Sequence, residues 1–360
     1  MIIVGDIASP SELHSKILYK TFESNENVFK KQTVICNFEG LISKNQSLKD
    51  RTPVLFNHPS VLKALNKGNV KVAGLANNHI LDLPLYYDET TALLIDANIQ
   101  TVGAGKTKNN ALEPVIFEDD GVEIFLINAC WDFLLYHQKN PTNNIYINTI
   151  NEFEILNQVK EIRKNSPNAK IVTFFHWSFD LERLPFPMYR QFSYDLIEAG
   201  VSLVVGAHSH CIQGGELYKN GCIIYGLGNF FIPNGVFANS KLRFPDWASE
   251  QLAIEWDIKS NIFKCHWFIS EGSNEKFKIE YLESTQLNND TKMSQYAPYQ
   301  HFTHEKYINF FKYNRRKRLL IPVFKNYKKR YINSCKLVLL KMRAKLARLI
   351  ANMGLIKWQN

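Results

Sequence analysis

Short apolar runs alternate with amphipathic segments along most of the chain. The runs have the length and the abrupt polar ends of buried strands, and they lie at residues 2–4, 34–36, 72–76, 171–175, 202–205 and 222–225. The segments between them have helical spacing, at residues 11–22, 59–66, 87–97, 152–163 and 188–199. Residues 114–117 and 122–127 predict a hairpin, and residues 251–257 and 263–270 predict two more strands. This pattern predicts an α/β sandwich of two sheets flanked by helices.

Polar side chains that can bind a metal ion follow these predicted strands. They are Asp6, Asn37, Glu39, Asn78, His79, His176, His208, His210 and Asn229. One such group also fits an ordinary polar turn, but its repetition at five strand ends favours a shared site, because ligands bind at the carboxyl ends of strands in open α/β sheets. Carboxylate, amide and imidazole together suit Mn²⁺, Fe or Zn²⁺ better than Mg²⁺ or Ca²⁺. We therefore expect one or two divalent ions, and two ions about 3.5–4 Å apart can hold a phosphate group.

The ordered motifs resemble those of the CapA proteins. They are Gly5-Asp6, Asn37-Phe-Glu39, Leu75-Ala-Asn-Asn-His79, His176-Trp-Ser, Gly206-Ala-His-Ser-His210 and Leu227-Gly-Asn-Phe230. The CapA proteins take part in capsule or poly-γ-glutamate synthesis and are a branch of the calcineurin-like metallophosphoesterase superfamily. The resemblance covers roughly residues 1–235, and the ordered set is far more specific than any single motif.

The resemblance implies a ligand set for two metal ions. Asp6 and His210 would bind the first ion, and Glu39 stands where the superfamily has a bridging Asp. The second ion would be bound by Asn78, His176 and His208.

The resemblance also implies a proton donor, His79, with Asp82 as its orienting partner. Three positions depart from the pattern. Ala8 stands where many superfamily members have a His, Ala207 where CapA proteins usually have another His, and Ser178 where Gly is usual. The first metal site therefore has few ligands, and a one-ion enzyme stays open beside a two-ion enzyme.

Substrate binding has its own candidates, which are Asn37, Asn77, Arg183, Arg190 and Asn229. The two arginines are candidates for binding an anionic substrate group, because a guanidinium group matches the geometry of a carboxylate or phosphate. Asp180 and Glu182 follow the His176 motif and are either substrate contacts or solvated charges.

Charge is distributed unevenly along the chain. The net charge is +9, but residues 306–360 contain 16 Lys and Arg and no Asp or Glu, which leaves 27 basic and 34 acidic residues, a balance of −7, in residues 1–305. We expect a catalytic domain at residues 1–285 and a basic helical extension at residues 286–360, with an anionic partner.

The extension carries an apolar stripe at helical spacing. Its residues are Ile332, Cys335, Leu339, Met342, Leu346, Leu349, Met353 and Ile356. Three interpretations stay open: the stripe docks on the protein or pairs with a second copy, it lies on an anionic membrane surface, or the arm binds nucleic acid. Nucleic acid is the least favoured, because no groove-reading motif accompanies the charge.

The cellular compartment is predicted from the cysteines and from the targeting segments that are not evident in the sequence. The six cysteines are scattered in apolar stretches, as expected for reduced core residues, and neither a signal peptide nor a spanning segment is evident. We expect a cytoplasmic protein, peripheral on the inner face of the membrane if the arm binds lipid.

The favoured function is a metal-dependent, phosphoesterase-like hydrolase in the synthesis of capsule or another envelope polymer, acting on an anionic or polymeric substrate such as a peptide or glycan. Two alternatives stay open: a non-catalytic assembly factor of a capsule or poly-γ-glutamate synthesis complex, and a peptide-modifying epimerase or amide hydrolase on the same fold.

Overall fold

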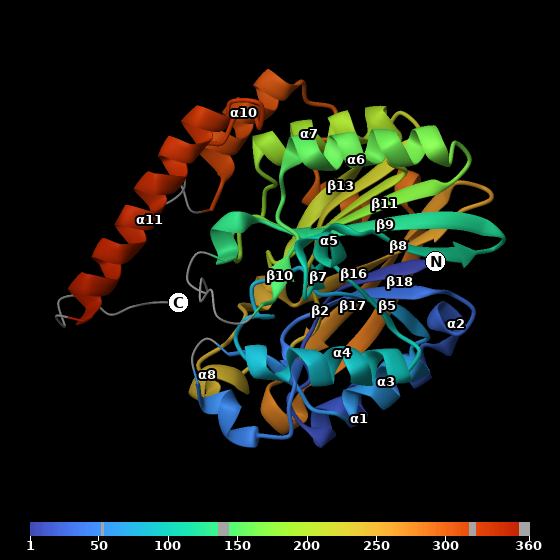
Figure 1. Cartoon of the computed structure of the whole chain (residues 1–360), viewed down its shortest axis with the longest axis vertical. Helices are drawn as coiled ribbons and strands as arrows, with labels where there is room; N and C mark the ends of the chain where they lie inside the picture. Colours follow the sequence, from blue (N-terminus) through green and yellow to red (C-terminus); the bar gives the residue numbers. More distant parts are fainter. Residues whose placement is uncertain (52–53, 136–143, 317–321, 353–360) are drawn as a thin grey trace.

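Two β-sheets stacked face to face form the centre of the molecule (Figure 1). The computed structural model describes residues 1–51, 54–135, 144–316 and 322–352, with side chains described up to residue 346 except at residue 344. The larger sheet has the strand order β18-β17-β16-β1-β2-β5-β6, and β15 also pairs with β1. The smaller sheet has the order β13-β14-β12-β11-β9-β8.

The strands of the larger sheet are β1 (Ile2–Ile7), β2 (Val34–Phe38), β5 (Val70–Gly74), β6 (Gln100–Val102), β15 (Asn229–Phe231), β16 (Glu250–Asp257), β17 (Ile262–Glu271) and β18 (Lys278–Gln286). Those of the smaller sheet are β8 (Val115–Asp119), β9 (Val122–Cys130), β11 (Lys170–His176), β12 (Leu203–Ala207), β13 (Ile212–Tyr218) and β14 (Gly221–Leu227). Two short ribbons pair β3 (Leu41–Ile42) with β4 (Phe56–Asn57) and β7 (Ala104–Gly105) with β10 (Tyr146–Ile147).

Helices cover the outer faces of both sheets. Figure 1 shows α1 (Glu12–Ser24), α3 (Val61–Lys67) and α4 (Tyr87–Asp96) outside the larger sheet, and α6 (Glu152–Asn165) and α7 (Pro187–Ala199) outside the smaller one. The shorter helices are α2 (Glu26–Phe29), α5 (Lys108–Leu112), α8 (Phe237–Ser240) and α9 (Thr291–Tyr296), and the chain continues with α10 (His304–Asn314) and α11 (Arg330–Asn352). The residues between the sheets are apolar and buried, among them Ile3, Val72, Leu126, Val205 and Leu252.

Parallel pairing places the carboxyl ends of several strands at one edge. In the larger sheet, β1 is parallel to β2 and to β15, and the register sets Asp6 beside Asn37 and Asn229. In the smaller sheet β9, β11 and β12 run parallel, and His176 at the end of β11 pairs with Ala207. The strand ends that carry polar motifs therefore meet at the same edge of the sandwich.

Two glycines permit the close packing behind this edge. A Cβ atom at Gly5 would lie 2.0 Å from the Gly228 carbonyl oxygen, and one at Gly206 would lie 1.9 Å from the Tyr225 carbonyl oxygen. Real Cβ atoms do not approach backbone so closely, so a side chain at either position would push strands apart just before Asp6 or His208.

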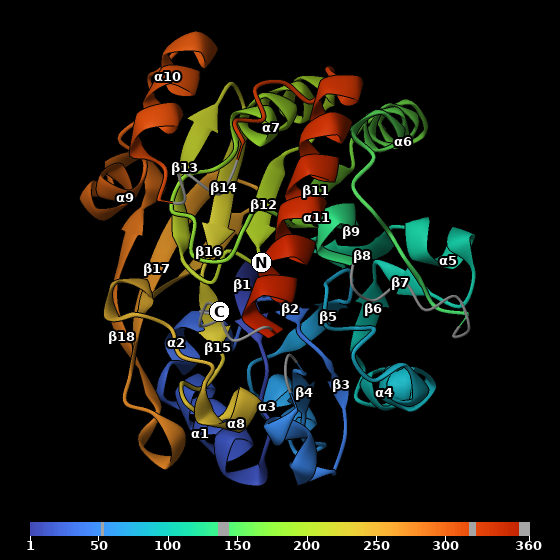
Figure 2. The same ribbon diagram turned by 90° about the vertical axis from the view of Figure 1, so that its left-hand side faces the viewer.

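The segment after residue 285 packs on the smaller sheet. Tyr307 and Phe311 of α10, then Phe324, Tyr327 and Leu340, are buried in the same apolar cluster as α6 and α7. The division predicted at residue 285 stays a prediction about folding units, but Tyr307, Phe311, Phe324, Tyr327 and Leu340 belong to the common core. Figures 1 and 2 show that α11 then runs past the edge at which β1, β2, β11 and β12 end.

The α/β sandwich predicted from the sequence is confirmed, including each predicted strand and helix before residue 271. Eight of the described strands were not predicted, and six of them have only two or three residues. The two longer ones are β13, which contains the adjacent Gly214 and Gly215, and β18, an edge strand with mostly polar residues. Five of the six cysteines are buried as expected; Cys335 is exposed on α11, so it is not a core residue.

Candidate metal centre

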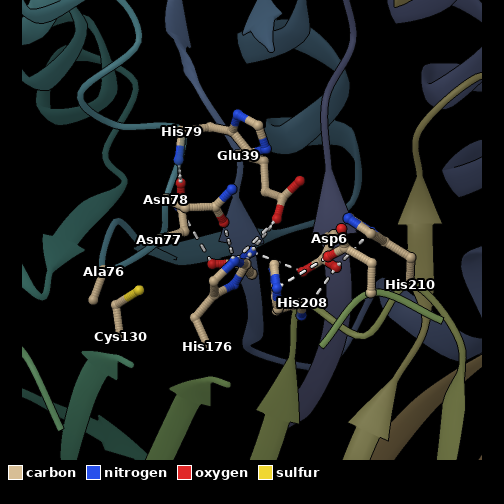
Figure 3. Close-up of polar contacts among 12 residues, drawn as sticks. Asp6, Glu39, Ala76, Asn77, Asn78, His79, Cys130, His176, His208 and His210 are labelled. Carbon is tan, nitrogen blue, oxygen red and sulfur yellow. Dashed lines mark hydrogen bonds and ion pairs between the residues drawn. The ribbon is translucent and has the colours of Figure 1, made fainter. Parts of the chain in front are cut away.

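The carboxyl ends of β1, β2, β5, β11 and β12 bring the predicted ligand residues together (Figure 3). Asp6 lies near the end of β1, Glu39 directly after β2, and His176 at the end of β11. Ligand atoms of these three buried residues lie within 4.8 Å of one another. A three-residue set with two carboxylates and one imidazole is therefore already assembled by the fold.

Asn37 links the members of this set. Its Nδ2 atom donates to Asp6 Oδ1 over 2.7 Å and lies 3.4 Å from Glu39 Oε1 and 3.2 Å from His176 Nδ1. One amide group thus holds two carboxylates near an imidazole, which makes Asn37 a positioning residue in this arrangement.

Asn78 lies beside the other nitrogen of the His176 ring. The Oδ1 atom of Asn78 lies 2.7 Å from His176 Nε2, and Glu39 Oε1 lies 3.5 Å from the same nitrogen. An amide oxygen, a carboxylate oxygen and an imidazole nitrogen converge there, and the donor types are those expected for a transition-metal ion.

A second ligand set lies on the loops after β11 and β12. Asp180, His208 and His210 offer ligand atoms within 4.8 Å of one another. His208 Nε2 is 3.0 Å from Asp180 Oδ1, while His210 Nδ1 is 3.4 Å from Asp6 Oδ2 and 2.7 Å from Asn229 Oδ1. Asp6 therefore lies close to both sets. The two sets are adjacent, since the ring centres of His176 and His208 are 4.6 Å apart.

The charges in the centre shift the pKa values of its groups. Burial and the neighbouring Asp6 carboxylate raise the pKa of Glu39 to about 8. Burial acts against protonation of His210, but the hydrogen bond to Asp6 and the nearby carboxylates raise its pKa to about 10. Burial and the adjacent His208 and His210 hold the pKa of His176 well below its usual value. The metal-free centre therefore retains protons that a bound cation would displace.

Backbone conformation around the second set is strained. His208 and His210 have positive φ angles of 82° and 50°, and Ser178 and Leu181 in the loop after β11 have φ angles of 79° and 57°. Non-glycine residues adopt such angles only where the surrounding structure holds them, and these positions cluster at functional sites. Ser178 has the conformation that favours Gly, and the Gln213 amide donates to its hydroxyl over 3.1 Å.

Two buried polar atoms test whether these residues fit a metal ion. Glu39 Oε2 and His208 Nδ1 are buried and have no hydrogen-bond partner within the described chain. An orphaned carboxylate oxygen costs about 1–3 kcal/mol or more when buried, and coordination is a usual explanation for such an atom. Together with the converging donors, these atoms show that the residues present fit one or two divalent cations. The assignment of individual ligands to a first and a second ion stays a prediction.

His79 and Asp82 form a pair at the accessible side of the centre. His79 Nδ1 lies 2.6 Å from Asp82 Oδ2, and the side chain of His79 is 11% exposed. The carboxylate can only accept, so Nδ1 donates and Nε2 stays available. Burial opposes protonation, but the Asp82 charge and hydrogen bond raise the pKa of His79 overall. Figure 3 shows the His79 ring on the same side as Glu39.

The predicted substrate-binding residues separate into two groups. Asn37, Asn77 and Asn229 lie in the centre and bond to its residues: Asn77 Nδ2 donates to the Phe38 carbonyl, and its Oδ1 accepts from the His79 backbone N–H. Arg183 is exposed and stacks over Trp247, 5.4 Å from the ring centre.

Arg190 lies away from these groups. Its guanidinium is buried, pairs with both oxygens of Glu216 at 2.7 Å and donates to the Phe302 carbonyl. The geometry accounts for Arg190 as a structural residue, so the structure does not bring this expected site residue to the centre.

Sequence reasoning did not select Asn57, and it considered Asp180 only as a substrate contact or a solvated charge, not as a candidate ligand. Asp180 stands four residues after His176, and that spacing was its only signal. Asn57 accepts from the Ser9 backbone N–H over 2.8 Å and donates to the Glu39 carbonyl oxygen over 2.9 Å, so it ties together the loops after β1 and β2. Nothing near Asn57 in the sequence marks that role.

The fold and the centre define the class of the protein: a two-sheet α/β sandwich with a mixed carboxylate, amide and imidazole centre at its strand ends, the arrangement that the metallophosphoesterase resemblance predicts. Residues 1–234 match the model of the family described as "Bacterial capsule synthesis protein PGA_cap". The chain belongs to this family.

Named relatives agree with this membership. The capsule biosynthesis protein CapA of Bacillus anthracis is 25% identical over 195 residues, 53% of this chain and 47% of that protein. The PGA biosynthesis protein CapA of Bacillus subtilis is 25% identical over 222 residues, 59% of this chain and 57% of that protein. The chain thus spans about half the length of the curated relatives it matches.

Solved structures show a weaker likeness. The NAD nucleotidase of Haemophilus influenzae aligns with 79% of this chain and 49% of its own length, at 12% identity and a TM-score of 0.38. The helices in the described part of the chain include none that is long and apolar enough to cross a membrane.

Proposed function

We propose that the protein is a metal-dependent hydrolase that cleaves a phosphoester or a related bond during the synthesis of capsule or another envelope polymer. The observation that carries the proposal is the convergence of Asp6, Glu39 and His176 with an unpaired buried oxygen, Glu39 Oε2, beside an oriented histidine, His79. Family membership supports the pathway, and the residues support the chemistry.

The metal ligands would come from both sets. Asp6 and His210 would hold one ion, Asn78, His176 and His208 would hold a second, and Glu39 would stand at the bridging position. When bound, a divalent cation supplies Lewis-acid stabilisation for the negative charge that develops in hydrolysis. Asn37 would keep both carboxylates aimed at the same point, since its amide already contacts each of them.

His79 would deliver the proton to the leaving group. Burial opposes protonation, but Asp82 holds the ring through Nδ1 and raises the pKa of His79, which favours the protonated imidazole that can donate from Nε2. The Asp82 oxygen also accepts from the Leu55 backbone N–H over 3.1 Å, which keeps the carboxylate in place. A cytoplasmic site of action is part of this proposal.

Hydrolysis and metal content together test the proposal. The purified chain is loaded with Mn²⁺ or dialysed against a chelator, and turnover of p-nitrophenyl phosphate, alkyl phosphates and γ-linked glutamate peptides is measured. We expect activity that chelation removes and Mn²⁺ restores. Glu39→Gln keeps the side-chain volume and should lower turnover at least about 100-fold. The matched control is Glu123→Gln on β9, which is exposed and should behave as the unaltered chain.

A second candidate is a non-catalytic assembly factor of a polymer-synthesis complex. The observation that favours it is Ala8, a fully buried methyl group at the position of a usual superfamily ligand. Elemental analysis separates the two candidates. Metal well below one ion per chain, with no turnover of any substrate in the panel, would support the assembly factor and contradict the hydrolase. A peptide epimerase or amide hydrolase would be recognised by turnover of the glutamate peptides alone.

A further inference from the structure

Helix α11 presents an apolar stripe to solvent. The stripe contains Ile332, Cys335, Leu339, Met342 and Leu346, and the exposed fractions of Leu339, Met342 and Leu346 are 59%, 63% and 56%. Val338 and Tyr331 lie beside it and are exposed as well. The last stripe residues predicted from the sequence, Met353 and Ile356, lie outside the described residues, and the side chain of Leu349 does as well.

The opposite face of α11 packs against the rest of the protein. Leu337 and Leu340 pack into the cluster below α7, Lys336 Nζ donates to the Val323 carbonyl over 2.7 Å, and Asn333 Nδ2 donates to the Asn326 carbonyl over 2.9 Å. Arg330 stacks over the Phe153 ring at 4.1 Å. With 3.6 residues per turn, these anchors and the stripe fall on roughly opposite sides of the helix. Docking on the body therefore does not cover the stripe.

The charges around the stripe are all of one sign. The helix contains Lys and Arg but no Asp or Glu, and the same is true of all residues from 306 to 360. At 3.6 residues per turn, Arg343 lies about 60° to one side of the stripe centre and Lys345 about 100° to the other. Two copies paired through this stripe would bring cationic helices together without an acidic partner, which is unfavourable. A polyanion alone would leave the apolar side chains in water.

We propose that α11 binds an anionic lipid surface, with the stripe at the boundary of the acyl chains and the flanking Lys and Arg on the headgroups. Charge complementarity selects this occupant over a second copy, and the exposed apolar side chains select it over nucleic acid. Figure 2 shows α11 crossing in front of the strand ends, so the bound helix would place the metal centre on the membrane side of the molecule.

Point variants of the full chain test the proposal, because truncation would remove core residues. Cosedimentation is measured with phosphatidylglycerol/phosphatidylcholine vesicles and with phosphatidylcholine vesicles, at low and high salt. We expect binding to the anionic vesicles only, falling steeply with salt. Arg343→Gln with Lys345→Gln should weaken binding roughly 30-fold, since interfacial cations contribute about 1 kcal/mol each. Leu339→Ser, Met342→Ser and Leu346→Ser together should weaken it by at least about tenfold.

Matched controls change the same residue types elsewhere. Lys16→Gln with Lys20→Gln alters two exposed lysines of α1, and Leu85→Ser alters a side chain that is 91% exposed. Both controls should bind as the unaltered chain does. The proposal is overturned if the arm variants sediment like the unaltered chain, if binding ignores lipid charge, or if the stripe variants only dissociate a dimer seen by light scattering. Turnover of a soluble substrate is measured in parallel, so failure here is distinguishable from failure of the proposed hydrolase.

Discussion

At the scale of single residues, variants of the His79–Asp82 pair can distinguish a proton-donor role of His79 from a structural role. Both residues lie at the accessible side of the centre, and Asp82 raises the pKa of His79. A proton donor matters most when the leaving group is a poor one, because a good leaving group departs without protonation.

We predict that His79→Gln lowers turnover of an alkyl phosphate about 10²–10⁴-fold, and that of p-nitrophenyl phosphate much less. Asp82→Asn should lower the pKa of His79 and so move the alkaline limb of the pH profile to lower pH. Steady-state rates across pH check both expectations, with the exposed His301→Gln as the control. An equal loss on both substrates would assign His79 to metal or substrate binding instead.

Arg183 and Arg190 provide a second contrast at this scale. Arg183→Ala removes an exposed cation three residues after Asp180, so KM for an anionic substrate should rise several-fold while thermal stability stays unchanged. Arg190→Ala leaves Glu216 buried without its partner and should destabilise the fold by about 3–5 kcal/mol. Denaturant unfolding and KM values check the pair. A stability loss in the Arg183 variant would contradict its placement at the surface.

At the scale of elements, the short strand β4 supports the centre from outside it. Asn57 bonds the loops that follow β1 and β2; Asp6 lies near the end of β1, and Glu39 lies in the loop after β2. A two-residue strand thus helps to hold two candidate carboxylate ligands in place, although it contributes no ligand itself.

We predict that Asn57→Ala destabilises the protein by about 1–3 kcal/mol, because it leaves the Ser9 N–H and the Glu39 carbonyl buried without that partner. Metal affinity should fall with it, since the Glu39 loop loses its tie. Thermal unfolding and metal titration of the folded variant measure the two effects, with the exposed Asn109→Ala as control. Unchanged metal affinity would show that the sheet ends alone position the ligands.

At the scale of the whole molecule, the metal centre makes stability depend on pH. Glu39, with a pKa of about 8 in the folded state against 4.5 normally, and His210, with about 10 against 6.5, both hold protons that the unfolded chain has lost. The folded state therefore binds more protons, and the free energy of unfolding falls as pH rises through this range.

We predict that the metal-free protein has a lower Tm at pH 9 than at pH 7, and that Mn²⁺ raises Tm more at pH 9, where fewer protons compete for the ligands. Differential scanning fluorimetry with and without the metal checks this. Glu39→Gln should reduce the pH dependence in the metal-free state. A Tm gain that is the same at both pH values would contradict the link between these groups and the metal.

The sequence by itself determined the alternation of strands and helices, because apolar runs and their polar ends are local patterns. It also selected Asp6, Glu39, His176, His208 and His210 as candidate ligands, since each lies at or shortly after the end of a predicted strand. The resemblance in motif order added the family, which the comparison over residues 1–234 confirmed.

Only the tertiary structure decided which of the candidate residues belong to the site and which do not. Arg183 and Arg190 look alike in sequence, but one is exposed and the other forms a buried pair with Glu216, 26 residues away. Asp180 and Asn57 entered the site through contacts with residues distant in the chain, which no local pattern records. The outward direction of the α11 stripe was likewise unpredictable, because helical spacing places residues on one face without specifying what that face meets.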